Sequence, residues 1–218
     1  MRYWHDVLPQ SFSMIERFNH GFPRARRADW GGARIRTLEI GAGSGGHLAF
    51  EDLSFQNYTA LELRESMAAR IRERYPQVEV LIADVQEHIP AADAHFDRVV
   101  AVHVLEHLPN LPAALAEVRR VLKPSGRFTA VLPCEGGLVY GLGRDLTTRR
   151  LFQKRYHTSY DWCIRSEHIN TCSEIMEELA RSFEVVKTRF WPLWIPIIHA
   201  NAIVGLVCEP RNCSELNL

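Results

Sequence analysis

The residues most able to do chemistry stand in the stretch HVLEHL, from His103 to Leu108. Its H-x-x-E-H pattern is that of the inverted zinc peptidases, which present two histidines and a glutamate from one helix. Pro109 follows directly, and a proline ends or kinks a helix of this kind. A zinc peptidase is therefore disfavoured. Glu106 and His107 either hydrogen-bond the loop around them or face a substrate.

A glycine-rich stretch, LEIGAGSGG at residues 38–46, follows a short apolar run. Gly41, Gly43 and Gly45 allow a tight turn and let backbone N–H groups approach a ligand at the start of a helix. With Gly46 as its last glycine, the stretch also fits the G-x-G-x-x-G fingerprint of dinucleotide-binding proteins, and Glu62 lies near the spacing of a ribose-binding acid. The loop alone leaves a nicotinamide cofactor and other ligands open.

Three acidic residues come at the ends of consecutive apolar runs: Glu39, Glu62 and Asp84. In an open α/β sheet the carboxyl ends of neighbouring strands form one ligand-binding edge, so these acids are expected to share a rim. A carboxylate at position 39 would repel a pyrophosphate and attract a cation. The rim therefore favours a ligand with a sulfonium or ammonium group, a ribose and an adenine.

The elements that must position these residues alternate between strand-like and helical patterns from Thr37 onward, which predicts a doubly wound Rossmann-like fold with helices on both faces. Seven strands are expected, mostly parallel, with an antiparallel pair at the edge of the sheet. The expected strands lie at residues 36–40, 58–63, 78–84, 96–104, 126–133, 183–190 and 201–210. The expected helices are one capped by Ser66 and ending at Tyr75, one with Leu111, Leu115, Val118 and Leu122 on one face, and one opened by a Thr171–Glu174 capping box.

Five segments, LEIGAGSG, ALELRESM, ADVQEHIP, FDRVVAVHVLEHLPN and VLKPSGRF, occur in this order over residues 37–133. In sequence and spacing they resemble the class I S-adenosylmethionine-dependent methyltransferases, and most of all the group with small-molecule acceptors that includes ubiquinone-biosynthesis enzymes. The resemblance specifies the fold and the cofactor but says little about the acceptor.

The resemblance implies a role for each matching residue. Glu39 and the loop of Gly41, Ala42, Gly43 and Gly45 would hold the methionine half of the donor. Glu62, with Leu63 beside it, would bind the ribose. Asp84 and the backbone of Val85 would recognise the adenine, and His103 would line the pocket. Some relatives are thought to bind a divalent metal near the last position, but the first residue of that pattern is a histidine here, so a bound divalent metal is the less favoured alternative.

The composition is consistent with one domain and gives no general preference for a charged partner. The chain has 218 residues with 26 basic and 26 acidic side chains, so no global charge favours nucleic acid or an anionic membrane. Five cysteines without a C-x-x-C pair predict reduced thiols and a cytoplasmic protein, and no signal peptide is visible. The apolar residues 190–208 are interrupted by two prolines, a histidine and an asparagine, so two strands joined by a loop explain them better than a membrane span.

The expected organisation of the single domain is an N-terminal helical segment or lid over residues 1–36, a cofactor-binding core over 37–133, a substrate-recognition insert over 134–170, and a last helix and strand pair over 171–218. The insert is basic and aromatic, and its candidate acceptor-binding residues are Tyr140, Arg144, Arg149, His157 and Trp162. Clustered arginines suit a phosphate or carboxylate, although a solvated basic helix face explains them equally well.

We expect methyl transfer to an oxygen or nitrogen atom of a small, anionic molecule such as a sugar phosphate, a nucleotide sugar or a specialised metabolite. Alignment and desolvation carry most of the catalysis, and the candidate bases are His103, His107 and His168. Three alternatives stay open: a lipid-linked acceptor reached through an exposed FWPLWIPII segment, a non-catalytic subunit or sensor that binds the donor, and an NAD-dependent oxidoreductase. The oligomeric state is not predicted.

Overall fold

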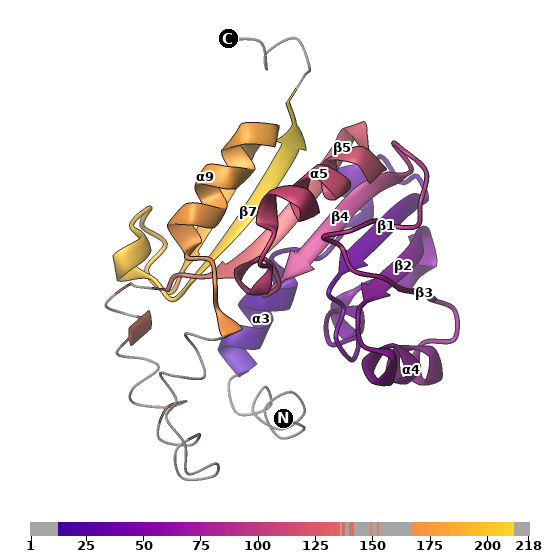
Figure 1. Cartoon of the computed structure of the whole chain (residues 1–218), viewed down its shortest axis with the longest axis horizontal. Coiled ribbons are helices and arrows are strands. Elements are labelled where there is room, and N and C mark those ends of the chain that lie inside the picture. Colours follow the sequence, from indigo (N-terminus) through magenta and orange to yellow (C-terminus); the bar gives the residue numbers. More distant parts are fainter. Residues whose placement is uncertain are drawn as a thin grey trace.

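The computed structural model describes residues 13–135, 137, 140, 141, 149, 152 and 167–211. They build one seven-stranded sheet in the order β3-β2-β1-β4-β5-β7-β6, with helices on both faces (Figure 1). The strands are β1 (Ile35–Ile40), β2 (Gln56–Glu62), β3 (Glu79–Ile82), β4 (Phe96–Val102), β5 (Leu122–Pro133), β6 (Phe183–Trp191) and β7 (Ile203–Pro210). The predicted doubly wound fold is confirmed.

The strand order places the ligand-binding edge. Strands β1 to β5 pair in parallel, and the order reverses between β1 and β4, the switch point at which such sheets bind ligands. Strand β7 pairs antiparallel with both β5 and β6, so β6 itself runs parallel to β5. The predicted antiparallel pair is present, with β7 placed inside the sheet and β6 at the edge.

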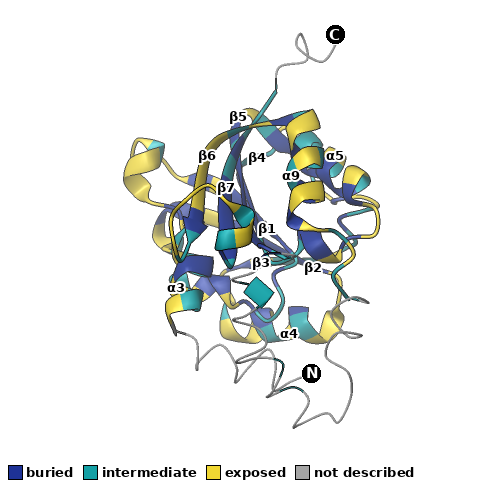
Figure 2. Cartoon of the chain, turned by 90° about the vertical axis from the view of Figure 1, so that its left-hand side faces the viewer, coloured by how far each residue is buried: buried dark blue, intermediate teal, exposed yellow. Residues whose placement is uncertain are grey.

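Each face of the sheet has its own helices. The α-helices are α3 (Ser13–Gly21), α4 (Glu65–Arg74), α5 (Leu111–Val121) and α9 (Cys172–Ser182). On one face α5 and α9 pack on the largest apolar cluster, which includes Leu38, Leu115 and Ile175. On the other face α4 covers Tyr58 and Ala60 of β2, and α3 inserts Phe18 against β5 and β7. The inner strands of the sheet are largely buried, whereas the edge strands β3 and β6 are largely exposed or half-buried (Figure 2).

The predicted capping residues agree with the observed starts of the helices, with one exception. Helix α9 begins with the predicted capping box, in which Thr171 and Glu174 hydrogen-bond each other's backbone N–H groups. Helix α5 begins after Asn110 and buries the predicted apolar face, while Leu122 belongs to the following strand. The predicted Ser66 cap is wrong: the N-cap is Arg64, two residues earlier, which is extended and makes no side-chain cap, and α4 begins at Glu65.

Short 3-10 helices fill the connections: η1 (Arg27–Trp30), η2 (His47–Phe50), η3 (Leu53–Phe55), η4 (Leu105–His107) and η5 (Ile198–Ala200). The helix expected after the glycine loop is therefore only the 3-10 turn η2. Residues 190–208 are the end of β6, a loop containing η5, and most of β7, as predicted. Among the described residues, no helix has the length and apolar character needed to cross a bilayer.

Candidate active site

The glycine loop joins β1 to η2 at the switch point. Gly41, Gly43 and Gly45 all have positive φ angles, of 62°, 56° and 81°, which side chains other than glycine rarely adopt. A Cβ atom on Gly41 would lie 2.6 Å from a methyl group of Val104, so the loop also packs directly on the segment after β4. Apart from its chain neighbours, no described residue has an atom within 4 Å of a Cβ built on Gly43, so this side of the loop is open to a ligand.

Glu62, the last residue of β2, contacts this loop. Its Oε2 accepts a hydrogen bond of 2.8 Å from the backbone N–H of Gly43, and its Oε1 accepts from the backbone and the side chain of Arg64. The side chain is only 3% exposed, whereas the neighbouring Leu63 is exposed. The carboxylate thus lies against the loop, where it is placed to accept hydrogen bonds from ligand hydroxyl groups.

Asp84 lies two residues beyond the end of β3, at the same carboxyl edge of the sheet, and Val85 follows it. The Asp84 carboxylate accepts hydrogen bonds from the backbone and side chain of Gln86. The backbone carbonyl oxygen of Asp84 accepts another from Glu87 N, and together these bonds fix a tight turn. Val85 is buried in the main apolar cluster. Gln86 in turn accepts from the backbone of Asn110 at the start of α5. The turn is therefore tied to the helix after β4.

Glu39 departs from the expected exposed rim. Its side chain is 3% exposed and points to the face of the sheet covered by α3 and α4, where Tyr58 donates a 2.9 Å hydrogen bond to its Oε2. Burial raises the pKa of this carboxyl group to about 8, against the opposing effect of the Tyr58 hydrogen bond. The acidic rim therefore consists of one half-exposed and two buried carboxyl groups.

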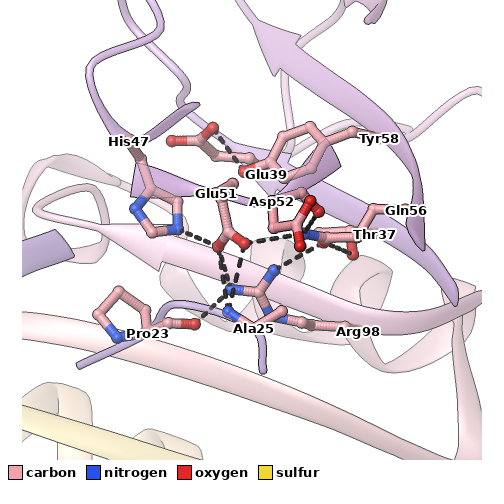
Figure 3. A network of polar contacts seen from close by, with 10 residues as sticks. All are labelled: Pro23, Ala25, Thr37, Glu39, His47, Glu51, Asp52, Gln56, Tyr58 and Arg98. Atoms are coloured by element: carbon pink, nitrogen blue, oxygen red, sulfur yellow. Dashed lines mark hydrogen bonds and ion pairs between the residues drawn. The ribbon is translucent and has the colours of Figure 1, made fainter. Parts of the chain in front are cut away.

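A buried polar network lies next to Glu39 on the same face (Figure 3). Arg98, in the middle of β4, pairs with Glu51 at 2.7 Å and donates to Gln56 and to the carbonyl oxygen of Pro23. His47 pairs with the same Glu51 at 2.8 Å. The network joins four segments: β4, β2, the turn after the glycine loop, and the chain before η1.

Charge within this network is set by burial and pairing. Burial alone would raise the pKa of Glu51, but Arg98 and His47 outweigh it and lower the pKa to about 2. Burial lowers the pKa of His47 to about 4, so its ring is neutral. Sequence reasoning missed this network, although a signal exists: Arg98 directly precedes the apolar run VVAV within the strand FDRVVAV. A charged residue at such a position has to be paired.

The HVLEHL stretch lies between β4 and α5. His103 adopts a positive φ of 53°, and its Nδ1 lies 3.3 Å from Oε1 of the buried Glu106. This pairing outweighs burial and lowers the pKa of Glu106. The Glu106 carbonyl oxygen accepts hydrogen bonds from Ile169 and Asn170, which bring the end of the insert onto this loop. Because only η4 is helical here, the zinc-peptidase arrangement is absent from this stretch.

Two histidines meet beside this loop. The ring centroids of His107 and His168 are 4.6 Å apart, and the two rings lie edge to face. His168 Nδ1 lies 2.6 Å from Glu135 Oε1, and the Tyr140 hydroxyl donates to the same oxygen. Glu135 outweighs the effect of burial and raises the pKa of His168. Residues from η4, from just beyond the end of β5 and from the segment before α9 thus form one titratable cluster. Glu135 was not predicted from sequence.

The remaining predicted residues are placed only in part. Tyr140 and Arg149 belong to the described residues, and the Tyr140 hydroxyl donates a hydrogen bond to Glu135. Arg144, His157 and Trp162 lie outside them, as does the first part of the proposed N-terminal lid. In the described part of the chain, no group of three or more His, Cys, Asp or Glu side chains is placed to hold a metal ion.

Residues 38–130 match the family model described as "Methyltransferase domain". This part of the chain is similar to an S-adenosylmethionine-dependent methyltransferase domain. The match covers the glycine loop, the three acids and HVLEHL, so the recognition made from sequence is confirmed. The residues present suit the donor, because the loop is open at Gly43 and the Glu62 carboxylate lies beside it.

Curated relatives support this methyltransferase domain. A phthiotriol/phenolphthiotriol dimycocerosates methyltransferase of Mycobacterium tuberculosis is 32% identical over 106 residues, which are 48% of this chain and 39% of that protein. A malonyl-[acyl-carrier protein] O-methyltransferase of Erwinia pyrifoliae is 36% identical over 107 residues, 49% of this chain and 40% of that protein. The chain thus spans less than half the length of these relatives.

Solved structures show that the fold extends beyond the matched residues. The PH0226 protein of Pyrococcus horikoshii is 19% identical with a TM-score of 0.65, covering 97% of this chain and 96% of that one. A Burkholderia thailandensis 1,6-didemethyltoxoflavin N1-methyltransferase, solved with S-adenosylhomocysteine, is 19% identical with a TM-score of 0.63, covering 97% and 84%. The [4+2]-cyclase SpnF shares the fold at 17% identity and a TM-score of 0.59, covering 83% and 77%.

Proposed function

We propose that this chain transfers a methyl group from S-adenosylmethionine to an oxygen or nitrogen atom of a small molecule that carries an anionic group. One observation carries the proposal: the Glu62-bound glycine loop and the His168–Glu135 pair both belong to the carboxyl edge of the same sheet. The first is a donor site and the second supplies a base for an acceptor.

The donor side uses residues that are already in place. Glu62 exchanges its hydrogen bond from Gly43 for the ribose hydroxyl groups, or shares it with them, and Asp84 with the Val85 backbone faces the adenine. Gly41, Ala42, Gly43 and Gly45 surround the methionine portion, with His103 beside it. The Glu39 carboxyl group, with its pKa near 8, is held by Tyr58 next to this portion. It loses its proton most readily when a cation is near.

The chemistry needs one proton acceptor. S-adenosylmethionine supplies a methyl group on a positively charged sulfur atom, which needs no further activation. A hydroxyl or ammonium acceptor must lose a proton as the new bond forms. His168 accepts that proton on Nε2 while Glu135 holds its other ring nitrogen, Nδ1. His103 and His107 are the alternative bases.

The insert, residues 134–170, is proposed to select the acceptor. Its basic and aromatic side chains, Tyr140, Arg144, Arg149, His157 and Trp162, are proposed to bind an anionic group. Two relatives are named for a dimycocerosate lipid and for malonyl-acyl carrier protein, so a lipid-linked acceptor is the second candidate. The cytoplasm is the proposed location, and Cys134, Cys172 and Cys208 are buried free thiols, as a reducing compartment allows.

Calorimetric titration with S-adenosylmethionine, S-adenosylhomocysteine and NAD(H) tests the donor site. We expect binding of the first two alone, weakened at least about tenfold, or about 1.4 kcal/mol, by Glu62→Ala. Glu65→Ala is the matched control, because this exposed carboxylate lies on α4 and pairs only with Arg72 in the described structure. Binding of NAD(H) alone would overturn the proposal in favour of an oxidoreductase.

Activity is then measured with methyl-labelled donor and a panel of phosphorylated, carboxylated and lipid-linked acceptors. Transfer to an anionic small molecule is the expected result. Donor binding without transfer to any compound would favour the non-catalytic alternative, which shares every donor-binding residue and which the shared fold does not exclude.

A further inference from the structure

The loop between β6 and β7 exposes a compact set of apolar side chains. Leu193, Trp194, Ile195 and Ile197 are 54%, 56%, 41% and 51% exposed, and they lie within five consecutive residues. We call residues 192–197 the apolar loop. It projects at the left of Figure 1, beyond α9. A contiguous exposed apolar group of this kind typically marks a protein or membrane interaction site.

The backbone of this loop is held in place. Asn201 is fully buried; its Oδ1 accepts a hydrogen bond from Leu193 N, and its Nδ2 donates to the carbonyl oxygens of Ile195 and Ile197. Trp194 adopts a positive φ of 61°, a strained conformation for a bulky residue. A buried side chain thus fixes a strained loop that turns its apolar side chains into solvent.

The stretch of chain that contains the apolar loop carries positive charge. No acidic residue occurs between Glu184 and Glu209, whereas Lys187 and Arg189 are both exposed on β6. The guanidinium group of Arg189 lies over the Trp194 ring at 5.0 Å. Arg189 and Trp194 also line an open pocket of about 450 Å³, together with Met176, Thr188, Phe190 and Pro196. An anionic group entering that pocket would meet Arg189.

The apolar loop also belongs to the active-site edge. Strand β6 runs parallel to β5, so its carboxyl end, where the loop begins, lies at the edge that carries the site. The base of the loop is joined to the insert, because Cys134 N donates to Ala202 O and a Cβ on Gly137 would lie 2.9 Å from Ile198 O. Trp194 also contacts Phe18 of α3 edge to face.

We propose that the apolar loop docks the protein on the surface of an anionic phospholipid membrane. Trp194 and the three aliphatic side chains enter the headgroup region, as interfacial aromatic and apolar residues do. Lys187 and Arg189 meet the lipid phosphates. A second copy of this chain is a poorer occupant, because a two-fold contact through this face would bring the same cations together. The inference does not depend on methyl transfer.

Vesicle flotation at low salt tests the proposal on the full chain, with phosphatidylcholine vesicles with and without phosphatidylglycerol. We expect binding to the anionic vesicles that weakens with salt. Leu193→Ser with Trp194→Ser should reduce it at least tenfold, and Lys187→Gln with Arg189→Gln about fivefold for each charge removed, since a cation near an anionic surface contributes about that factor.

Two controls match these variants. Ile82→Ser removes a comparably exposed apolar side chain from β3 at the opposite side of the sheet, and Arg36→Gln removes an exposed cation near the amino end of β1. Both should bind vesicles as the unaltered protein does. Donor binding by each variant, measured separately, verifies the fold, and the charge variant keeps the test valid if the apolar variant does not fold.

Other outcomes overturn the proposal. These are no association with anionic vesicles, association that neither altered pair changes, or equal losses in the controls. A dimer that forms with rising concentration and is abolished by the Leu193 and Trp194 substitutions, without vesicle binding, would assign the loop to a contact between copies.

Discussion

The two ends of the carboxyl edge of the sheet are built in different ways. At the proposed donor end, beside β1, β2 and β3, the carboxyl groups of Glu39 and Glu62 are buried and hydrogen-bonded to neighbouring strands or to the glycine loop. At the proposed acceptor end, the group formed by His107, Glu135 and His168 is partly exposed and assembled from distant segments. The function that we propose would use this difference, because one fold can keep its cofactor site and change the site of its acceptors.

The largest effect is expected at the donor end, from breaking its buried network. Arg98→Met leaves the Glu51 carboxylate buried without its main partner, which should lower the free energy of unfolding by about 3–5 kcal/mol. Urea unfolding measures the loss. Adding Glu51→Gln should recover part of it, while Arg36→Met, at an exposed position, should change little. A loss below about 1 kcal/mol for Arg98→Met would mean that this end is not held by its ion pair.

The next effect tests the burial of Glu39 through pH. The folded state keeps the proton of this carboxyl group up to a pKa of about 8, whereas the unfolded chain loses it near 4.5, so the contribution of Glu39 to stability falls as pH rises between these values. Relative to Glu39→Gln, the unaltered protein should therefore lose on the order of 3 kcal/mol from pH 5 to pH 8. Urea unfolding at several pH values measures this difference. If the free energies of unfolding of the two proteins changed with pH in the same way, the Glu39 carboxyl group would be in contact with water instead.

The smallest of the three effects tests the acceptor end by kinetics. His168→Ala should lower kcat about 100-fold, or about 2.7 kcal/mol, when the acceptor needs a base. The rate should rise with pH through the raised pKa of His168, and Glu135→Gln should move that rise to lower pH. His95→Ala, at the amino end of β4, is the control. An unchanged pH profile in Glu135→Gln would reduce the pair to a structural contact.

Much of the donor end was predictable because its residues follow one another along strands and turns. The glycine loop, the strand ends at Glu62 and Asp84, and the Thr171–Glu174 capping box are each encoded within a few residues. Adjacent parallel strands bring their carboxyl ends together, so acids at three strand ends had to share one edge. The Ser66 cap was wrong because Glu62 accepts hydrogen bonds from the backbone and the side chain of Arg64, and α4 begins directly after that residue.

The sequence by itself thus determined the order of strands and helices, the glycine loop and the resemblance to methyltransferases, because local patterns and strand ends carry that information. Only the tertiary structure decided that Glu39 and Glu62 are buried, that Arg98 meets Glu51, that Glu135 pairs with His168, and that Asn201 turns Trp194 outward. Most of these contacts join different elements of the chain. Their formation depends on how the two helical layers and the loops pack on the sheet, and no short stretch of sequence records that packing.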